Sequence, residues 1–198
     1  MGIAASELCR YVIRPTLIYL GRHNRAAEAL LLGIAASQSA LGAELDNPPG
    51  HGLYSIADTQ HHQLWDEYLA RDPDLASLVR GLASQHAFLT GPDLELTVNL
   101  RYSTAIAWLM VEASHISLPD ADDSLAMAHM WREIFQPDGQ LQDFTSAWQT
   151  WVSPYSRPHQ PFRDRPVLNE KAANFQDCPT RTALNRLIQA MARGEKYW

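Results

Sequence analysis

Apolar residues recur at helical spacing along most of the first 152 residues, and this pattern predicts a mainly α fold. The segment 24–44 is apolar almost all round, so we expect a central, buried helix with Asn24 as its N-cap. The run Leu53–Ile56 could form a small strand or a loop. Further helices are expected over 3–20, 59–71, 73–87, 92–115, 123–135 and 140–152.

Prolines and aspartates mark where these helices bend or begin. Pro15 should bend or split the first helix, because proline cannot donate a main-chain hydrogen bond. Pro73 suits the first turn of its helix. Asp58 or Thr59 can cap the helix expected over 59–71. Asp122 or Asp123 can cap the helix expected over 123–135.

The character of the chain changes at residue 153. Residues 1–152 carry 8 Lys and Arg against 18 Asp and Glu, whereas residues 153–198 carry 8 against 4. The segment from 153 is rich in proline and should be an extended arm that ends in a short amphipathic helix over 181–193. A basic arm next to an acidic body suggests that the arm binds something, although its helix could equally pack on its own body.

Composition limits the other partners. With 16 Lys and Arg against 22 Asp and Glu, a general nucleic-acid binder is not expected. The longest apolar run, Ala29–Ala36, is far too short to span a membrane. A disulfide between Cys9 and Cys178 is possible but is not the favoured interpretation.

Four motifs, in order, carry a resemblance to a known family. The segment 30–42 reads as a buried helix that ends in Gln-Ser, and Gly52-Leu53-Tyr54 follows after a break. Later come an Asn-led segment, 99–105, and an Ala-rich segment, 125–131. Over about residues 10–152 the chain resembles phage virion proteins related to soluble lytic transglycosylases. The resemblance implies a lysozyme-like helical domain, 1–152, with a minimal β-turn region, followed by the arm, 153–198.

The departures from the family pattern bear on catalysis. Gln38 stands where these enzymes have their catalytic glutamate, and glutamine has no titratable proton to give to a glycosidic oxygen. Ser55 replaces a family glutamine, and His129 or Met130 replaces a tyrosine. Three altered positions indicate lost catalysis.

Other acids could substitute only weakly. Asp46 and Asp58 flank the turn, but helix termination and capping explain them better. Glu28 lies ten residues before Gln38, about 15 Å along a helix. The resemblance implies a glycan groove lined by Gln38, Ser39, Ser55 and Tyr102.

The histidines do not show metal-ligand spacing. His51, His61 and His62 are close in sequence, but no His-x-x-x-His pair occurs. The adjacent residues His61 and His62 should point to different sides of a helix, as surface or capping residues. We therefore predict no metal site and no cofactor.

The resemblance implies a structural virion protein of a tailed phage or phage-like particle, in the tail, baseplate or connector, made in the bacterial cytoplasm. Its partners would be other virion subunits in several copies, with peptidoglycan as a possible ligand. Alternatives are an active peptidoglycan hydrolase and a glycan-binding module without catalysis. The residues expected to bind partners are Trp151, Arg157, Phe162, Arg163, Arg165, Leu184, Leu187 and Trp198.

Overall fold

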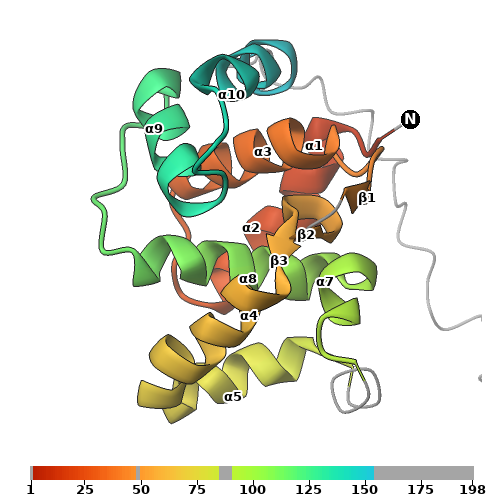
Figure 1. Ribbon diagram of the computed structural model, residues 1–198, viewed down its shortest axis with the longest axis vertical. Coiled ribbons are helices and arrows are strands. Elements are labelled where there is room, and N and C mark those ends of the chain that lie inside the picture. The colour runs from red at the N-terminus through yellow and green to blue at the C-terminus, as the bar shows by residue number, and fades with distance from the viewer. Residues whose placement is uncertain (1, 48–49, 85–90, 154–198) are drawn as a thin grey trace, which may run out of the picture. The chain divides into compact units, whose positions relative to one another are not determined.

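The computed structural model describes residues 2–47, 50–84 and 91–153, which belong to one unit of the chain, residues 1–158. This part is mainly α, as predicted (Figure 1). The predicted arm lies outside the described residues except for Ser153. The helical elements, with η for 3-10 and π segments, are α1 (Ala5–Leu8), η1 (Cys9–Ile13), α2 (Arg14–Tyr19), α3 (Arg25–Ser39), η2 (Gly52–Tyr54), α4 (Asp58–Gln63), η3 (Leu64–Tyr68), η4 (Leu69–Arg71), α5 (Pro73–Leu82), α7 (Leu94–Val98), α8 (Leu100–Ala113), α9 (Ser124–Ile134), α10 (Leu141–Ala147) and η5 (Trp148–Val152).

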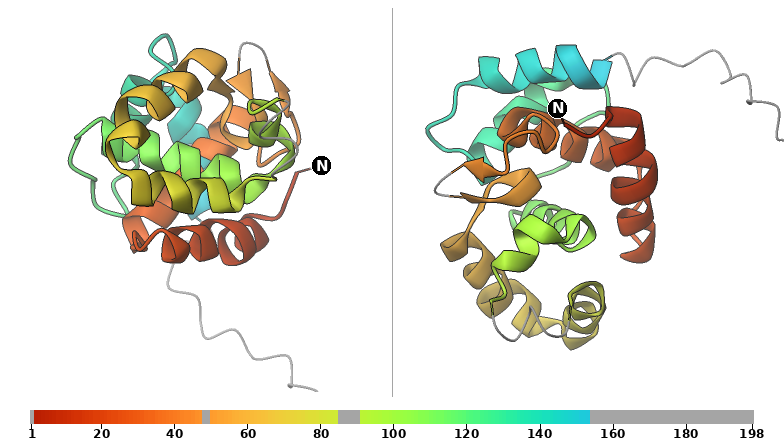
Figure 2. Two further views of the ribbon diagram at one scale, coloured as in Figure 1. Left: turned by 90° about the horizontal axis from the view of Figure 1, so that it is seen from below. Right: turned by 90° about the vertical axis from the view of Figure 1, so that its right-hand side faces the viewer.

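The first predicted helix is divided by a π segment directly before Pro15. Pro15 has no main-chain N–H and cannot bond the carbonyl one turn back, and the wider π turn of η1 ends next to it. Segment η1 and helix α2, part of the red run in Figure 2, pack against α3 and α8. The helical run over 5–19 therefore changes type two residues before Pro15.

Helix α3 is the centre of the core. Asn24 caps it as predicted, because its side chain accepts a hydrogen bond from Ala27 N at 2.7 Å. In Figure 1 the helix lies between α10 and α8, and it contacts both. A Cβ atom on Gly33 would lie 2.6 Å from Phe144 Cζ, so glycine is what lets α10 approach this closely. The apolar pattern predicted this burial correctly.

The central helix ends earlier than the pattern indicates. It stops at Ser39 rather than residue 44, because Ala40, Leu41 and Gly42 follow one another in the left-handed region, with φ of 47°, 57° and 83°. Such a run cannot continue a right-handed helix. The turn brings the chain back along the end of α3.

A small antiparallel sheet follows this turn. Its strands β1 (Asp46–Asn47), β2 (Gly50–His51) and β3 (Ile56–Ala57) pair in the order β1-β2-β3, with Asp46 opposite His51 and His51 opposite Ile56. The run predicted as a strand or a loop, Leu53–Ile56, covers the last two residues of the 3-10 turn η2 and the first residue of β3.

Three further helix boundaries need correction, and one is the helix expected over 73–87, which ends at Leu82 because Ala83 is extended. The helix expected over 92–115 is two helices, because Asn99 is extended and caps α8 by accepting from Tyr102 N at 3.1 Å. Neither Asp58 nor Thr59 caps α4, which begins at Asp58 without a side-chain cap from Ala57. Asp123 does cap α9, accepting from Ala126 N at 2.9 Å.

Candidate functional site

The last turn of α3 carries Gln38 and Ser39, and α3 packs here against η2. Gln38 is only 8% exposed, and Ser39 is fully buried. The Ser39 hydroxyl lies 3.0 Å from the Ala35 carbonyl oxygen and 2.8 Å from that of Leu53, while Gly42 N donates to it at 3.0 Å. Ser39 thus serves as a link between α3 and η2 inside the protein.

The Gly-Leu-Tyr turn is fixed by close packing on the other side. Gly52 has φ +65°, and a Cβ atom there would run into the Leu96 carbonyl oxygen. The hydroxyls of Tyr54 and Thr104 are 3.0 Å apart in the core, which joins η2 to α8. Ser55, which follows, is partly buried and left-handed, with φ 48°.

The acids proposed as substitutes lie on the sheet side of the molecule. Asp58 is 55% exposed, and its Oδ1 is 2.6 Å from His51 Nε2. The main chain of Asp46 pairs with His51 in the sheet, and the Asp46 side chain lies outside the described part. The structure therefore brings His51 and Asp58 together, an ion pair that the sequence did not indicate.

Glu28 lies in a different environment. It is buried, and Arg14 donates to both of its carboxylate oxygens, at 2.6 and 3.0 Å. His23 Nε2 lies 2.7 Å from Oε1, and the Cys9 thiol donates to Oε2 at 3.4 Å. Burial alone would raise the pKa of Glu28, but the hydrogen bonds from Arg14, His23 and Cys9 hold that pKa below its ordinary value. A carboxylate held ionised in this way is unsuited to act as a general acid.

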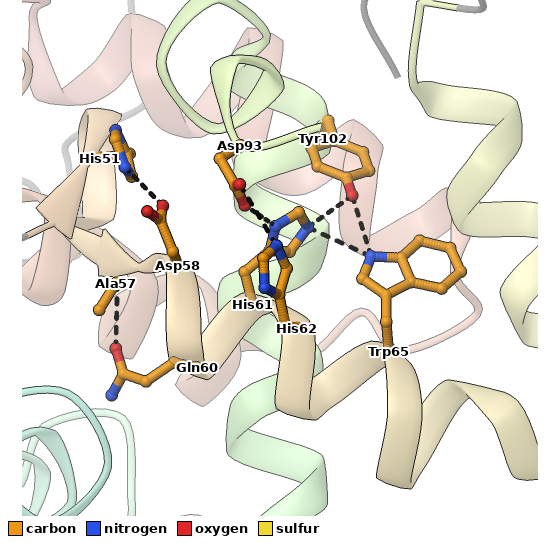
Figure 3. Close-up of polar contacts among 9 residues, drawn as sticks. All are labelled: His51, Ala57, Asp58, Gln60, His61, His62, Trp65, Asp93 and Tyr102. Carbon is orange, nitrogen blue, oxygen red and sulfur yellow. Dashed lines mark hydrogen bonds and ion pairs between the residues drawn. The ribbon is translucent and has the colours of Figure 1, made fainter. Parts of the chain in front are cut away.

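A buried polar chain runs from α4 to α8 (Figure 3). His61 is fully buried, with Nδ1 2.7 Å from Asp93 Oδ1 and Nε2 2.7 Å from the Tyr102 hydroxyl. Trp65 Nε1 donates toward the same hydroxyl at 3.1 Å. The interpretation of His61 as a surface or capping residue is therefore wrong, because the inner face of α4 turns this ring into the core.

His62 also reaches Asp93, from the solvent side. Its side chain is 57% exposed, and its Nε2 is 3.3 Å from Asp93 Oδ2. Although His61 is buried and His62 is exposed, both rings reach the carboxylate of Asp93, each at a different oxygen (Figure 3). The sequence reasoning missed this because Asp93 is 31 residues away from His62 and no short motif joins them.

Burial governs the ionisation of this chain. It lowers the pKa of His61 despite the neighbouring Asp93 carboxylate, so the neutral ring is favoured. It also raises the pKa of Tyr102, which keeps the phenol protonated. Tyr102, predicted to line a glycan groove, is fully buried and bonds within the protein.

A cleft of about 520 Å³ lies elsewhere, between α4 with η3 and the ends of α8 and α9. It is lined by residues that include Gln60, Glu67, Tyr68, Arg71, His115 and Glu133. None of the four predicted groove residues lines it.

Among the predicted partner-binding residues, the structure describes only Trp151. Its side chain, in η5, is 43% exposed. The others, Arg157, Phe162, Arg163, Arg165, Leu184, Leu187 and Trp198, lie outside the described residues. Within the described ranges, no helix has both the length and the apolar character needed to cross a bilayer.

No protein-family model, curated protein or solved structure matches this chain.

Proposed function

We propose that this protein is a structural virion protein of a tailed phage or phage-like particle, built on a lysozyme-like domain that no longer cleaves peptidoglycan. The observation that carries the proposal is the position of Gln38. This amide occupies the last turn of a buried helix, and a three-stranded antiparallel sheet follows at once. In the family that the sequence resembles, a carboxylic acid acts at this point.

The surroundings of Asp58 and Glu28 support the absence of hydrolysis. A glycosidase general acid is a carboxylic acid whose pKa is raised by an apolar environment. Asp58 is mostly exposed and paired with His51, and Glu28 is held as a carboxylate by Arg14. Whether Asp46 acts as the general acid is tested by an activity measurement.

Charge and exposure support an assembly role. The body, 1–152, is acidic and the segment 153–198 is basic, so that the arm of one copy suits the body of another subunit. Trp151, a residue type favoured at interface hot spots, is 43% exposed where this segment begins. We propose that it and the arm residues bind neighbouring virion subunits.

Clearing of a peptidoglycan suspension tests the loss of catalysis. The natural chain should not clear it. Clearing by a Gln38→Glu variant alone would show an intact site whose acid was lost, which supports a former enzyme. Gln142→Glu makes the same chemical change on the exposed face of α10 and should have no effect. Clearing by the natural chain would contradict the proposal and would direct attention to Asp46 and Asp58.

Co-sedimentation with insoluble peptidoglycan distinguishes the assembly role from the glycan-binding alternative. If the natural chain neither clears nor binds peptidoglycan, the assembly role is supported. Saturable binding that a Gln38→Ala change weakens at least tenfold would instead establish a glycan-binding module.

Incorporation into particles tests assembly directly. The chain should be present in particles purified away from cell extract. A variant with Arg157, Arg163 and Arg165 all changed to Glu should be lost from them, while its thermal unfolding stays that of the natural chain. Absence of the natural chain from purified particles would overturn the proposal.

A further inference from the structure

We propose that His61, His62 and Asp93 form a binding site for a divalent transition-metal ion of the zinc type, which fastens α4 to the turn before α7. One potential ligand atom from each residue lies within 4.8 Å of the others. Imidazole nitrogens and a carboxylate oxygen are common zinc ligands. The proposal does not depend on the role of Gln38 or on the virion function.

The donor spacing already approaches that of a metal site. Two ligands at about 2 Å from a tetrahedral ion are separated by roughly 3.3 Å. Here the Asp93 carboxylate is 2.7 Å from His61 Nδ1 and 3.3 Å from His62 Nε2, through different oxygens. For an ion to bind, the Asp93 carboxylate and His61 Nδ1 have to separate by roughly 0.6 Å, while the nitrogen donors of the two histidines already lie within 4.8 Å of each other.

Different ring atoms explain how neighbouring helical residues converge. Side chains at successive helical positions diverge by about 100° around the axis. The inner histidine, His61, offers Nδ1, which is close to the main chain, and the outer one, His62, reaches round with its distant Nε2. Their ring centroids are 5.9 Å apart and the rings are tilted by 34°.

The surroundings of His61 match those of a metal-bound histidine. A ligating ring normally fixes its other nitrogen on an oxygen. His61 Nε2 lies 2.7 Å from the Tyr102 hydroxyl, to which Trp65 Nε1 also donates at 3.1 Å (Figure 3). With Nδ1 on the ion, Nε2 carries the ring hydrogen and donates it to the Tyr102 oxygen. Trp65 Nε1, which also lies 3.2 Å from His61 Nε2, then donates to the Tyr102 oxygen and not to the ring. The pair therefore holds the ring in the orientation that the site requires.

Charge and exposure favour a cation that can be reached from solvent. The Asp93 side chain is 26% exposed and that of His62 is 57% exposed. The Asp93 carboxylate brings a negative charge to both rings. Three protein ligands leave a fourth position for water or for a donor from another molecule.

Titration of the metal-stripped full-length chain with Zn²⁺, by calorimetry, and with Co²⁺, by visible absorption, tests the site. We expect one equivalent to bind, with the intense Co²⁺ bands of a four-coordinate site. Loss of a residue that only orients a metal ligand costs roughly 10- to 100-fold in affinity. His62→Gln, at an exposed position, removes a ligand itself and should weaken Zn²⁺ binding by more than this. Asp93→Asn should act in the same direction.

His51→Gln is the matched control, since His51 is also partly exposed and also pairs with an aspartate. It should leave the affinity within about twofold. Zn²⁺ should raise the melting temperature of the natural chain and of this control, but not that of His62→Gln. The proposal is overturned if the natural chain shows no saturable binding, or if His62→Gln and His51→Gln bind Zn²⁺ equally.

Discussion

The Ser39 hydroxyl lies 2.8 Å from the main-chain carbonyl oxygen of Leu53, and this contact ties the end of the central helix to the Gly-Leu-Tyr turn. The same oxygen accepts from Gly42 N at 3.0 Å. One buried side chain thus contacts three pieces of backbone, at Ala35, Gly42 and Leu53, beside the position that we propose once held a catalytic acid. These contacts hold the last turn of α3, which carries the amide side chain of Gln38.

Loss of this hydroxyl should destabilise the fold. In Ser39→Ala, the buried Leu53 carbonyl and Gly42 amide lose a partner, which should cost about 1–3 kcal/mol of unfolding free energy. Ser37→Ala is the control, because Ser37 is partly exposed and bonds only the Ile34 carbonyl of its own helix in the described contacts. It should change stability by less than about 0.5 kcal/mol. Urea denaturation measures the unfolding free energy of both variants. Equal losses would show that the Ser39 hydroxyl does not stabilise the contact between α3 and η2.

The turn η2, which the Ser39 hydroxyl contacts, should tolerate only glycine at position 52. Gly52 and Gly21 both have positive φ, +65° and +70°, so alanine is strained at either position by about 1–2 kcal/mol. Nothing lies within 4 Å of a Cβ atom at Gly21, whereas at Gly52 it meets the Leu96 carbonyl oxygen. Gly52→Ala should therefore lower the unfolding free energy by at least about 2 kcal/mol more than Gly21→Ala. Similar melting temperatures for the two variants would contradict the packing described for η2 and α7.

The parts of the fold that the sequence predicted correctly depend on local rules. The burial of α3 follows from apolar residues on all sides, and Asn24 and Asp123 cap their helices as their positions suggest. The end of α3 was missed because Ala40 and Leu41 adopt left-handed backbone, which these residue types rarely indicate. The apolar pattern alone also missed the break at Asn99, whose extended backbone and side-chain bonds to Glu95 and Leu82 divide one apolar run into two helices.

The polar clusters were beyond prediction because their members are distant in sequence. His61 meets Asp93 and Tyr102, 32 and 41 residues away, and Glu28 meets Arg14 and Cys9, 14 and 19 residues away. Helical periodicity predicts which face of an element is buried, but not which polar side chain of another element is opposite it. The glycan groove remains a prediction for Gln38 and Ser55, whereas Ser39 and Tyr102 bond inside the core.

The buried cluster around Glu28 should stabilise the protein through its charge. Glu28→Gln keeps the shape but weakens the bonds from Arg14 and His23, and we expect a loss of about 1–3 kcal/mol at pH 7. Asp122→Asn removes the same charge from the exposed pair with Arg25, whose atoms are 3.0 Å apart, and should cost no more than about 0.5 kcal/mol. Chemical denaturation at pH 7 compares the two. A loss at Glu28 no larger than that at Asp122 would contradict a stabilising role for the cluster.

The same carboxylate predicts how the stability of the fold responds to acid. The pKa of Glu28 in the folded protein lies below its ordinary value of 4.5 because Arg14, His23 and Cys9 outweigh its burial. The unfolded chain therefore binds the proton first as the pH falls. The contribution of Glu28 is fully present above pH 4.5 and is lost as the pH falls from there through the folded-state pKa. Unfolding free energies measured from pH 6 to pH 3 should decline less steeply for Glu28→Gln than for the natural chain, with Asp122→Asn following the natural chain. Parallel curves for Glu28→Gln and the natural chain would show that Glu28 titrates alike in the folded and unfolded states.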